Sequence, residues 1–364
     1  MRGAPRASTR RIAVLLLLSV ATIAASGDAK DPLAAEIARW ADYLKANTAT
    51  DDLAKSVKDS AGPSLAIAQQ ALAKDRRLLA LFRVGHVNTN LSGLAYVQGL
   101  PPAASADLAG FEAEWARMGK VLAPSLAPLK ADALAQVRPA GVRAMGEAAL
   151  PQVRGYYEAS LEYGHNTMPQ YGLLYIGSAQ AQREFIALTR KLSEPTSKKA
   201  PPLRSLAPEI EALQAELLAA YKPPASIDRH SEFIGASSTL NDARQLDAAG
   251  LRYGATMRYL QSALRLATLR AEKPAIEAAA VPGKLAEIDR QLTSSEIDHS
   301  IARYFLEAAQ NEIDAGPPPA GSPIAPAVAT DVIARYFAAL EPAKTAAVQP
   351  KADVTVTLVR WPYT

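Results

Sequence analysis

Residues 161–177 read LEYGHNTMPQYGLLYIG, a stretch rich in tyrosine and glycine inside a chain dominated by alanine and leucine. Gly164 and Pro169 interrupt its helical spacing, because glycine weakens a helix and proline lacks the backbone N–H that a helix interior uses. We therefore expect a helix to end or bend here. In one interpretation the stretch joins two helices, with glycine allowing close approach and half-buried tyrosine rings filling the interface.

The second interpretation of the same stretch is a ligand pocket at the bend. Aromatic side chains with polar tips are suited to orienting a ligand in a concave site. The residues expected to converge there are Tyr163, His165, Asn166, Tyr171 and Tyr175. The sequence alone leaves the joint and the pocket both open.

A similar pattern, LRYGATMRY, begins at Leu251 and repeats the Leu-x-Tyr-Gly, the Thr-Met and the final Tyr of the first stretch. It has no counterpart of Pro169, so we expect one helix from about 247 to 270. Apolar residues lie on most sides of that helix, which is typical of a central helix packed between neighbours. Leu251, Tyr259 and Leu266 are expected in the core. The repeat suggests that the fold has two related halves.

Helical spacing of apolar residues continues through most of the chain. Asp31 and Pro32 are typical of a helix start. Gly62-Pro63 is expected to restart the chain into a second run that ends near Phe82. Further helices are expected at about 105–119, 145–163, 178–193, 205–221, 240–271, 282–313 and 328–340.

These patterns predict an all-α fold, either a multi-helix bundle or an irregular helical array. One stretch differs: DVTVTLVRWPYT at 353–364 alternates with a period of two and predicts one short C-terminal β-strand, whose partner stays open. Proline-rich segments separate the helical regions. The expected organisation is a signal peptide at 1–26, an N-terminal helical region at 27–194, a C-terminal helical region at 203–314, a proline-rich linker at 315–327, and a terminal helix with the strand at 328–364.

The N-terminus is organised like a secretory signal peptide. Four arginines precede an apolar run from Ile12 to Ala25, which ends in small residues. The run is shorter than the roughly 20 residues that span a bilayer core, so a permanent anchor is not expected. We expect cleavage after Ala25 or Ser26, a periplasmic or secreted protein, and no membrane span in the mature chain.

The basic balance of the chain belongs to this leader. Residues 1–26 hold four arginines and no acidic residue, so the formal charge of +4 falls to zero in the remainder. Lys and Arg there alternate with Asp and Glu, which argues against a nucleic-acid partner. The chain has no Cys, which excludes disulfides and thiolate metal sites.

Two Glu-x-x-His spacings are the best candidates for chemistry, because helical bundles with di-iron sites use that pattern. We expect Glu296 to complete a capping box at the start of a helix, with His299 beside it on a solvated face. Glu158, Glu162 and His165 likewise share a polar side of their helix. The metal-site alternative uses as ligands Glu158, Glu162, His165, Glu296 and His299.

No catalytic motif accompanies these features: the sequence has no His-Glu-x-x-His, no Gly-x-Ser-x-Gly, no Walker loop and no dinucleotide-binding glycine pattern. We therefore expect an exported, soluble protein of the bacterial cell envelope with a non-catalytic binding or scaffolding role. No cofactor is expected, and the protein or small-molecule partner is unknown. The alternative is a metal-dependent hydrolase or oxidase that uses the Glu-x-x-His ligands.

Overall fold

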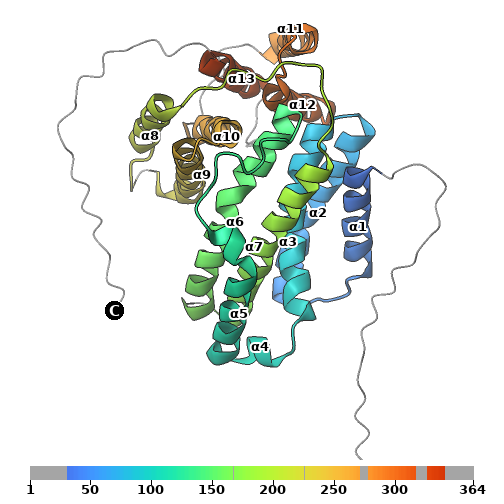
Figure 1. Ribbon diagram of the computed structural model, residues 1–364, viewed down its shortest axis with the longest axis vertical. Coiled ribbons are helices and arrows are strands. Elements are labelled where there is room, and N and C mark those ends of the chain that lie inside the picture. Colours follow the sequence, from blue (N-terminus) through green and yellow to red (C-terminus); the bar gives the residue numbers. More distant parts are fainter. Residues whose placement is uncertain (1–30, 167, 225, 271–277, 317–325, 341–364) are drawn as a thin grey trace, which may run out of the picture. The chain divides into compact units, whose positions relative to one another are not determined.

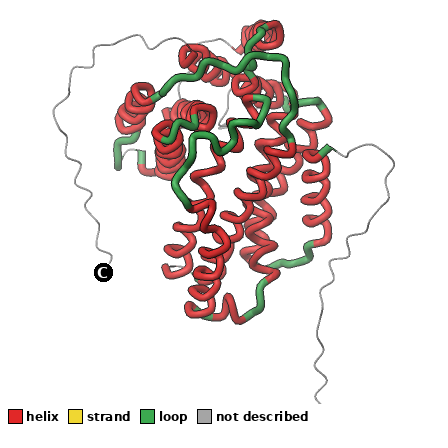
Figure 2. The backbone as a smooth tube through the Cα atoms, in the orientation of Figure 1, coloured by secondary structure: helices red, strands yellow, loops and turns green. Residues whose placement is uncertain are grey.

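The computed structural model describes residues 31–166, 168–224, 226–270, 278–316 and 326–340. Within these ranges every regular element is a helix, which confirms the predicted all-α fold (Figure 2). The α-helices are α1 (Pro32–Ala46), α2 (Asp52–Ala73), α3 (Arg77–Gly99), α4 (Ala103–Ala106), α5 (Leu108–Leu126), α6 (Ala140–Asn166), α7 (Pro169–Lys191), α8 (Ala207–Ala220), α9 (His230–Ala248), α10 (Arg252–Arg270), α11 (Val281–Ser294), α12 (Ser300–Asp314) and α13 (Pro326–Leu340). Two 3-10 helices, η1 (Ile227–Arg229) and η2 (Ala278–Ala280), precede α9 and α11.

Four long helices pair as two hairpins, α2 with α3 and α6 with α7 (Figure 1). α3 also packs along α7, which joins the two hairpins. α1 lies against α2 and α3, and α5 lies against α6 and α7. α9 and α10 form a third hairpin that packs on α6 through α10, while α12 contacts α3, α6 and α13.

Glycines bring α3 and α7 close together where they cross. A Cβ added at Gly177 would lie 2.8 Å from the Cα of Gly93 and 2.6 Å from the Cβ of Tyr96. Neither glycine can therefore be enlarged without moving a helix, because Cβ atoms do not approach other carbon atoms so closely. This contact fixes the spacing between the two hairpins.

The principal hydrophobic core draws on helices from α1 to α13. The two expected helical regions share it, since Leu91 and Leu260 belong to the same buried cluster. α10 is a central helix, as predicted: Leu251, Tyr259 and Leu266 are 0%, 4% and 2% exposed. Leu251 packs in a small separate cluster with Leu246 and Ala255.

α2 runs through Gly62-Pro63, so the expected restart at that point is wrong. Buried residues on both sides of the proline pack against α3, and this burial keeps the helix continuous where the proline removes one hydrogen bond. The chain breaks instead after α2, where Asp75 has a φ of 56° in the left-handed region that Asp tolerates. α3 then extends well past Phe82.

The helix expected at 240–271 is two helices, α9 and α10. Gly250 separates them with a φ of 78°, a left-handed conformation that ends a helix and favours glycine. The start of α10 is capped from α6, because the carboxylate of Glu147 accepts a hydrogen bond from Gly254 N at 2.8 Å. A partner remote in the sequence therefore determines where this helix begins.

The helix expected at 282–313 is also two, α11 and α12, divided at residues 295–299. Lys199 N donates to Glu296 O at 2.7 Å, and Asp298 N donates to Lys199 O at 2.8 Å. These bonds form an isolated parallel bridge between Lys199 and Ile297, and they use backbone groups that a continuous helix would need. The predicted capping box at Glu296 is therefore wrong.

Glu296 and His299 do not share a solvated face, and that prediction is wrong as well. His299 is 8% exposed, and its Nδ1 lies 3.0 Å from the Tyr336 hydroxyl. Glu296 is exposed and forms an ion pair with Lys199 at 2.8 Å. The expectation assumed one helix through both residues, whereas they lie in the segment that precedes α12.

The expected signal peptide at 1–26 and the expected strand at 353–364 lie outside the described residues. The same holds for most of the expected linker at 315–327. Among the helices that are described, none is both long enough and apolar enough to cross a membrane.

Candidate functional site

The tyrosine- and glycine-rich stretch is the turn of the α6–α7 hairpin. α6 ends at Asn166 and α7 begins with Pro169 at its first position, where a missing backbone N–H is tolerated. A Cβ added at Gly172 would lie 2.8 Å from the Cα of Gly164, and a Cβ at either glycine would meet the Phe111 ring at 2.4 to 2.5 Å. The prediction that glycine allows close helix approach here is confirmed.

The sequence echo at Leu251 has a similar packing role in a different position. A Cβ added at Gly254 would lie 2.6 Å from the Cβ of Glu147, so α10 also approaches α6 at a glycine. The first copy, however, closes α6 and opens α7, whereas the second copy opens α10. The two copies share close packing but not their place along a helix.

The five residues that were expected to converge in one pocket do not lie together. They are Tyr163, His165, Asn166, Tyr171 and Tyr175. The Tyr163 ring stacks on Tyr175 with centroids 4.3 Å apart, and Tyr156 lies 5.8 Å from Tyr175. His165 instead points toward α5, with its Nε2 3.1 Å from a carboxylate oxygen of Glu112. Tyr171 packs on the core and Asn166 is exposed.

Burial raises the pKa of the Tyr175 phenol, and the neighbouring Tyr163 phenol raises it further. The phenol therefore stays protonated at neutral pH and can act as a hydrogen-bond donor. Among the described residues, no ring contact or hydrogen bond joins His165 or Asn166 to this tyrosine stack. The arrangement at the turn therefore favours the interpretation as a joint between helices over the interpretation as a single ligand pocket.

The two Glu-x-x-His motifs lie at opposite ends of α6. His165 lies near its last residue, whereas the segment that holds His299 meets its first residue, since Ala140 N donates to Asp298 at 2.6 Å. Twenty-five residues of helix at 1.5 Å each separate them by roughly 37 Å. One metal pair cannot use both motifs, and no group of three His, Asp or Glu side chains in the described ranges could hold a metal ion.

Glu158, Glu162 and His165 line an open hollow on the surface between α5 and α6. Its other lining residues include Trp115 and Glu112, and its volume is about 680 Å³. Glu158 and His165 are exposed to solvent, as the predicted polar side of the helix requires. A carboxylate and an imidazole that stay in water are not held in the dehydrated arrangement that metal chemistry in a bundle needs.

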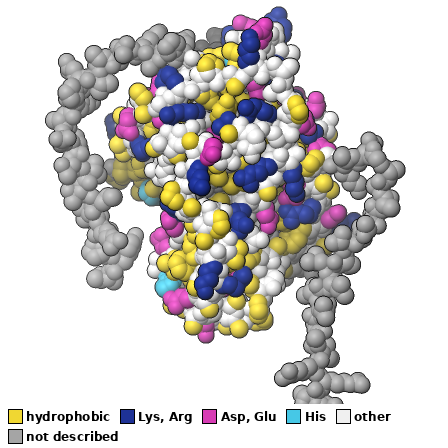
Figure 3. Space-filling model, in the orientation of Figure 1, with side chains coloured by type: hydrophobic (Ala, Val, Ile, Leu, Met, Phe, Trp, Pro, Cys, Tyr) yellow, Lys and Arg dark blue, Asp and Glu magenta, His cyan; other side chains and the backbone are white. Residues whose placement is uncertain are grey.

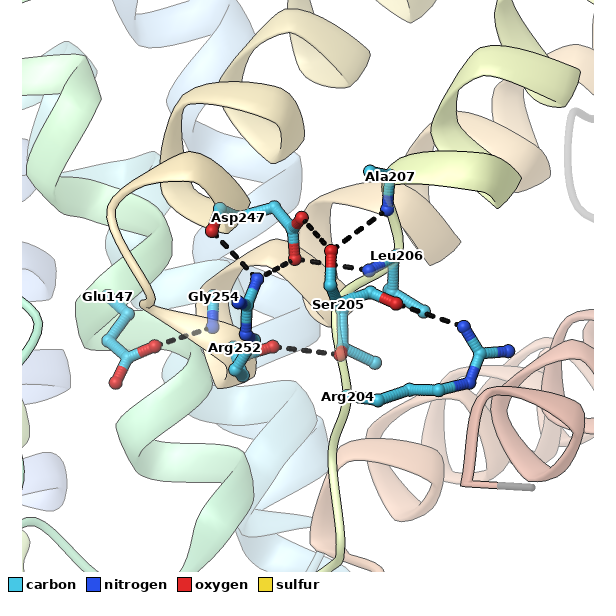
Figure 4. Close-up of polar contacts among 9 residues, drawn as sticks. Glu147, Arg204, Ser205, Leu206, Ala207, Asp247, Arg252 and Gly254 are labelled. Atoms are coloured by element: carbon cyan, nitrogen blue, oxygen red, sulfur yellow. Dashed lines mark hydrogen bonds and ion pairs between the residues drawn. The ribbon is translucent and has the colours of Figure 1, made fainter. Parts of the chain in front are cut away.

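Buried carboxylates that could pass for catalytic acids are used to cap helices (Figure 4). The fully buried Glu147 binds Arg143 Nε at 2.7 Å through one oxygen and Gly254 N at 2.8 Å through the other. Asp247 accepts from Ser205 Oγ at 2.6 Å and Leu206 N at 3.1 Å at the start of α8. These carboxylates are occupied by donors of their own chain.

Two further buried carboxylates cap helices in the same way. Asp298 accepts from Ala140 N at the start of α6, and Glu307 accepts from Leu79 N at 2.8 Å at the start of α3. Burial raises the pKa of Glu307 to about 7, against the opposing effect of the Leu79 N–H and of Arg303. The unsatisfied N–H groups of a helix start account for these acids without catalysis.

A wide groove lies between α5, α7 and the connecting segment 127–139, with α6 at its base. Its volume is about 960 Å³, within the range of small-molecule sites. Figure 3 shows hydrophobic side chains and Lys and Arg side chains next to one another on the face where α5 and α7 lie in Figure 1. The lining comprises Arg117, Met118, Val121, Pro124, Ser125, Ala127, Pro128, Leu129, Lys130, Ala133, Leu150, Val153, Gln180, Arg183, Glu184, Ile186, Ala187 and Arg190.

The apolar part of this groove comes from three helices. Met118 of α5, Val153 of α6 and Ile186 of α7 are buried at its base. Val121 is 44% exposed at its edge, a large fraction for an apolar side chain in a helix. The groove therefore presents an apolar floor that an apolar ligand could cover with a gain in free energy.

The charged part of the groove is predominantly basic, with four Lys or Arg side chains and a single carboxylate, Glu184. Arg117 is bound to Glu114 at 2.6 Å, and Arg183 donates to Val121 O at 3.2 Å. Lys130 and Arg190 are exposed, and their side chains form no hydrogen bond or ion pair within the described part of the chain. They leave positive charge for a ligand.

Sequence reasoning missed this groove, because its residues come from three separate stretches at 117–133, 150–153 and 180–190. No single stretch carries a motif. A weak signal was available on α7, where Gln180, Arg183, Glu184 and Arg190 recur at helical spacing on one face.

Comparison with models of protein families, with curated proteins and with solved structures finds no match for this chain. The function is therefore inferred from the geometry of the chain itself.

Proposed function

We propose that this chain is an exported helical binding protein of the bacterial cell envelope, without catalytic activity, whose ligand is an anionic amphiphile. The ligand has an apolar body and an acidic head group, and it occupies the groove between α5 and α7. The observation that carries the proposal is the apolar floor beside the unpaired Lys130 and Arg190. The signal-like sequence at 1–26 supports export.

The apolar floor favours the apolar body of the ligand, and the basic edge favours its acidic head group. A chain or ring of the ligand that lies on Met118, Val153 and Ile186 removes its own apolar surface from water, and it also covers the exposed Val121. A carboxylate or phosphate at the edge finds positive charge that the protein does not neutralise itself. The buried carboxylates elsewhere already accept hydrogen bonds at helix starts, so they are not available as catalytic acids or bases. The groove residues therefore support binding better than acid–base catalysis.

The test is a fluorescence titration of the chain without residues 1–26, using 11-(dansylamino)undecanoate and its uncharged methyl ester as probes. We expect the acid to bind about fivefold more tightly than the ester, because one charge contact is worth roughly 1 kcal/mol near a surface. Val121→Asp should weaken binding of both probes by about tenfold or more. Arg190→Gln should weaken binding of the acid and leave binding of the ester unchanged.

Leu218→Asp is the matched control, because Leu218 is 58% exposed on α8 and does not line the groove. It should leave both affinities unchanged. Equal affinity for the acid and the ester would reject the anionic head group. Failure of both probes to bind, or an equal loss in Leu218→Asp, would reject the groove as the site.

A further inference from the structure

The hollow between α5 and α6 has an aromatic wall that is held in place by several contacts. Trp115 of α5 stacks on Tyr157 of α6, with ring centroids 4.9 Å apart and an interplanar angle of 11°. The indole Nε1 donates to Tyr157 O at 3.3 Å, and the Tyr157 hydroxyl donates to Trp115 O at 3.0 Å. A ligand in the hollow therefore meets an aromatic surface that is already ordered, which lowers the cost of binding.

Leu161 continues this wall along α6. It lines the same hollow and is 37% exposed, whereas Val153 and Tyr157 of the same helix are buried. Ala116 of α5 also lines the hollow and is exposed. A ligand that covers Leu161 and the partly buried Trp115 removes apolar surface from water. The wall therefore favours a ligand with an aliphatic body.

The polar side chains of the hollow are mainly acidic. Glu112, Glu158 and Glu162 line it, together with His165. His165 Nε2 is 3.1 Å from Glu112 at one end, and Arg154, which is outside the lining, is 3.9 Å from Glu158 at the other. Glu162 lies between these pairs, and its side chain forms no hydrogen bond or ion pair within the described ranges. This excess of carboxylates favours a cationic ligand.

The three carboxylates are spread along the hollow and do not surround one point. Glu158 and Glu162 are one helical turn apart, roughly 6 Å along the axis of α6. His165, which contacts Glu112, lies roughly 4 to 5 Å further along the same axis. A metal ion needs its ligands around one centre, whereas a linear chain with several ammonium groups matches this spread. The methylene segments between such groups match the apolar wall.

We propose that the hollow between α5 and α6 binds a linear aliphatic polyamine. Its ammonium groups lie beside Glu112, Glu158 and Glu162, where each donates charge-assisted hydrogen bonds to a carboxylate. Its methylene segments lie on Trp115 and Leu161. This site shares no residue with the groove between α5 and α7, whose charged side chains are predominantly basic. The polyamine site is therefore separate from the proposed site for the anionic amphiphile.

The test is isothermal titration with spermidine at low ionic strength, where charge contacts at a surface are least screened. It uses the chain without residues 1–26, which keeps every described residue. Octane-1,8-diamine is similar in length but lacks the central ammonium group, so we expect it to bind about twofold to fivefold more weakly. Mg²⁺ should bind about tenfold more weakly than spermidine, because it buries no methylene group.

Substitutions in the hollow separate the two parts of the proposed contact. Glu162→Gln removes a charge from an exposed side chain and should weaken spermidine binding by about twofold to fivefold. The double variant Glu158→Gln with Glu162→Gln should weaken it by about fivefold or more. Leu161→Gln removes apolar surface only, so it should weaken spermidine binding by about twofold to fivefold and leave Mg²⁺ binding unchanged.

Glu211→Gln is the matched control, because Glu211 is an exposed glutamate of α8 that lies outside the hollow. It should leave spermidine affinity unchanged. Circular dichroism of each variant checks that the helical content of the parent chain is kept. Equal affinity for spermidine and octane-1,8-diamine would reject a polyamine as the ligand. Mg²⁺ binding as tight as that of spermidine, an equal loss in Glu211→Gln, or absence of spermidine binding at about 1 mM would overturn the site.

Discussion

Four buried carboxylates of this protein cap the starts of helices. Glu147, Asp247, Asp298 and Glu307 each come from one element and accept a backbone N–H at the start of another. The helix start supplies unpaired donors and a partial positive charge, which together stabilise a carboxylate away from water. For Glu307 this stabilisation does not overcome burial, since its pKa is about 7.

The raised pKa of Glu307 predicts that stability falls as the pH rises. An unfolded Glu titrates near 4.3, so between about pH 4.3 and 7 the folded state holds the proton more tightly than the unfolded state. Over that window the free energy of unfolding should drop by about 2 to 3 kcal/mol from this group. Glu307→Gln keeps an acceptor for Leu79 N and carries no charge, so it should lose that dependence and exceed the parent chain in stability at pH 8. Urea unfolding at pH 5 and pH 8 measures the effect.

The exposed Glu296→Gln serves as the control for this prediction and should leave the pH dependence as it is. If Glu307→Gln unfolds with the same pH profile as the parent chain, Glu307 is ionised in the folded protein at pH 5, and the assignment fails.

Pairs of helices in this fold are held at distances that only glycine permits. α6 and α7 meet at Gly164 and Gly172 beneath the Phe111 ring, and α3 and α7 meet at Gly93 and Gly177. An added methyl group at such a contact must displace an aromatic ring or a backbone, whereas the same group on an open helix face meets nothing. The α6–α7 hairpin therefore depends on the glycines of the opening stretch.

Gly164→Ala should lower the free energy of unfolding by about 1 to 3 kcal/mol, because its Cβ would lie 2.4 Å from the Phe111 ring. Gly155→Ala on the same helix is the matched control. No atom lies within 4 Å of a Cβ added there, so the gain in helix propensity should stabilise the chain by about 0.5 to 1 kcal/mol. Chemical denaturation measures the free energy of unfolding of both variants. We expect it to fall in Gly164→Ala and to rise in Gly155→Ala. A rise in Gly164→Ala would contradict the close contact with Phe111.

At the scale of the whole molecule, one buried core spans both expected helical regions, and the groove between α5 and α7 lies at its surface. The groove collects its basic residues from α5, the connecting segment after it and α7. This groove arises from packing among segments that are distant in sequence.

Export is a prediction about the whole chain, made from its first 26 residues. If the arginine-rich start and the apolar run act as a signal peptide, protein recovered from the envelope of an expressing bacterium should begin near Ser26 or Gly27. Intact mass and N-terminal peptide analysis measure this directly. Recovery of a chain that still carries Met1 in the soluble envelope fraction would contradict it.

The helical class of the fold and the burial of α10 follow from the sequence, because apolar spacing is a local property. The break at the α6–α7 turn follows for the same reason, since Pro169 limits the backbone wherever it occurs. Gly62-Pro63 is the exception, and there burial against α3 outweighs the proline. The sequence around Gly62-Pro63 does not show whether the local preference of proline or the packing against α3 has the larger effect.

Helix limits elsewhere were decided by tertiary contacts. α10 begins where Glu147 of α6 supplies a cap, and the segment before α12 is held by pairing with Lys199. The burial of His299 follows from that pairing, and a helical wheel drawn through it misplaces the side chain. The groove escaped prediction for the same physical reason: it joins side chains that are distant in sequence, and only the packing of the helices brings them together.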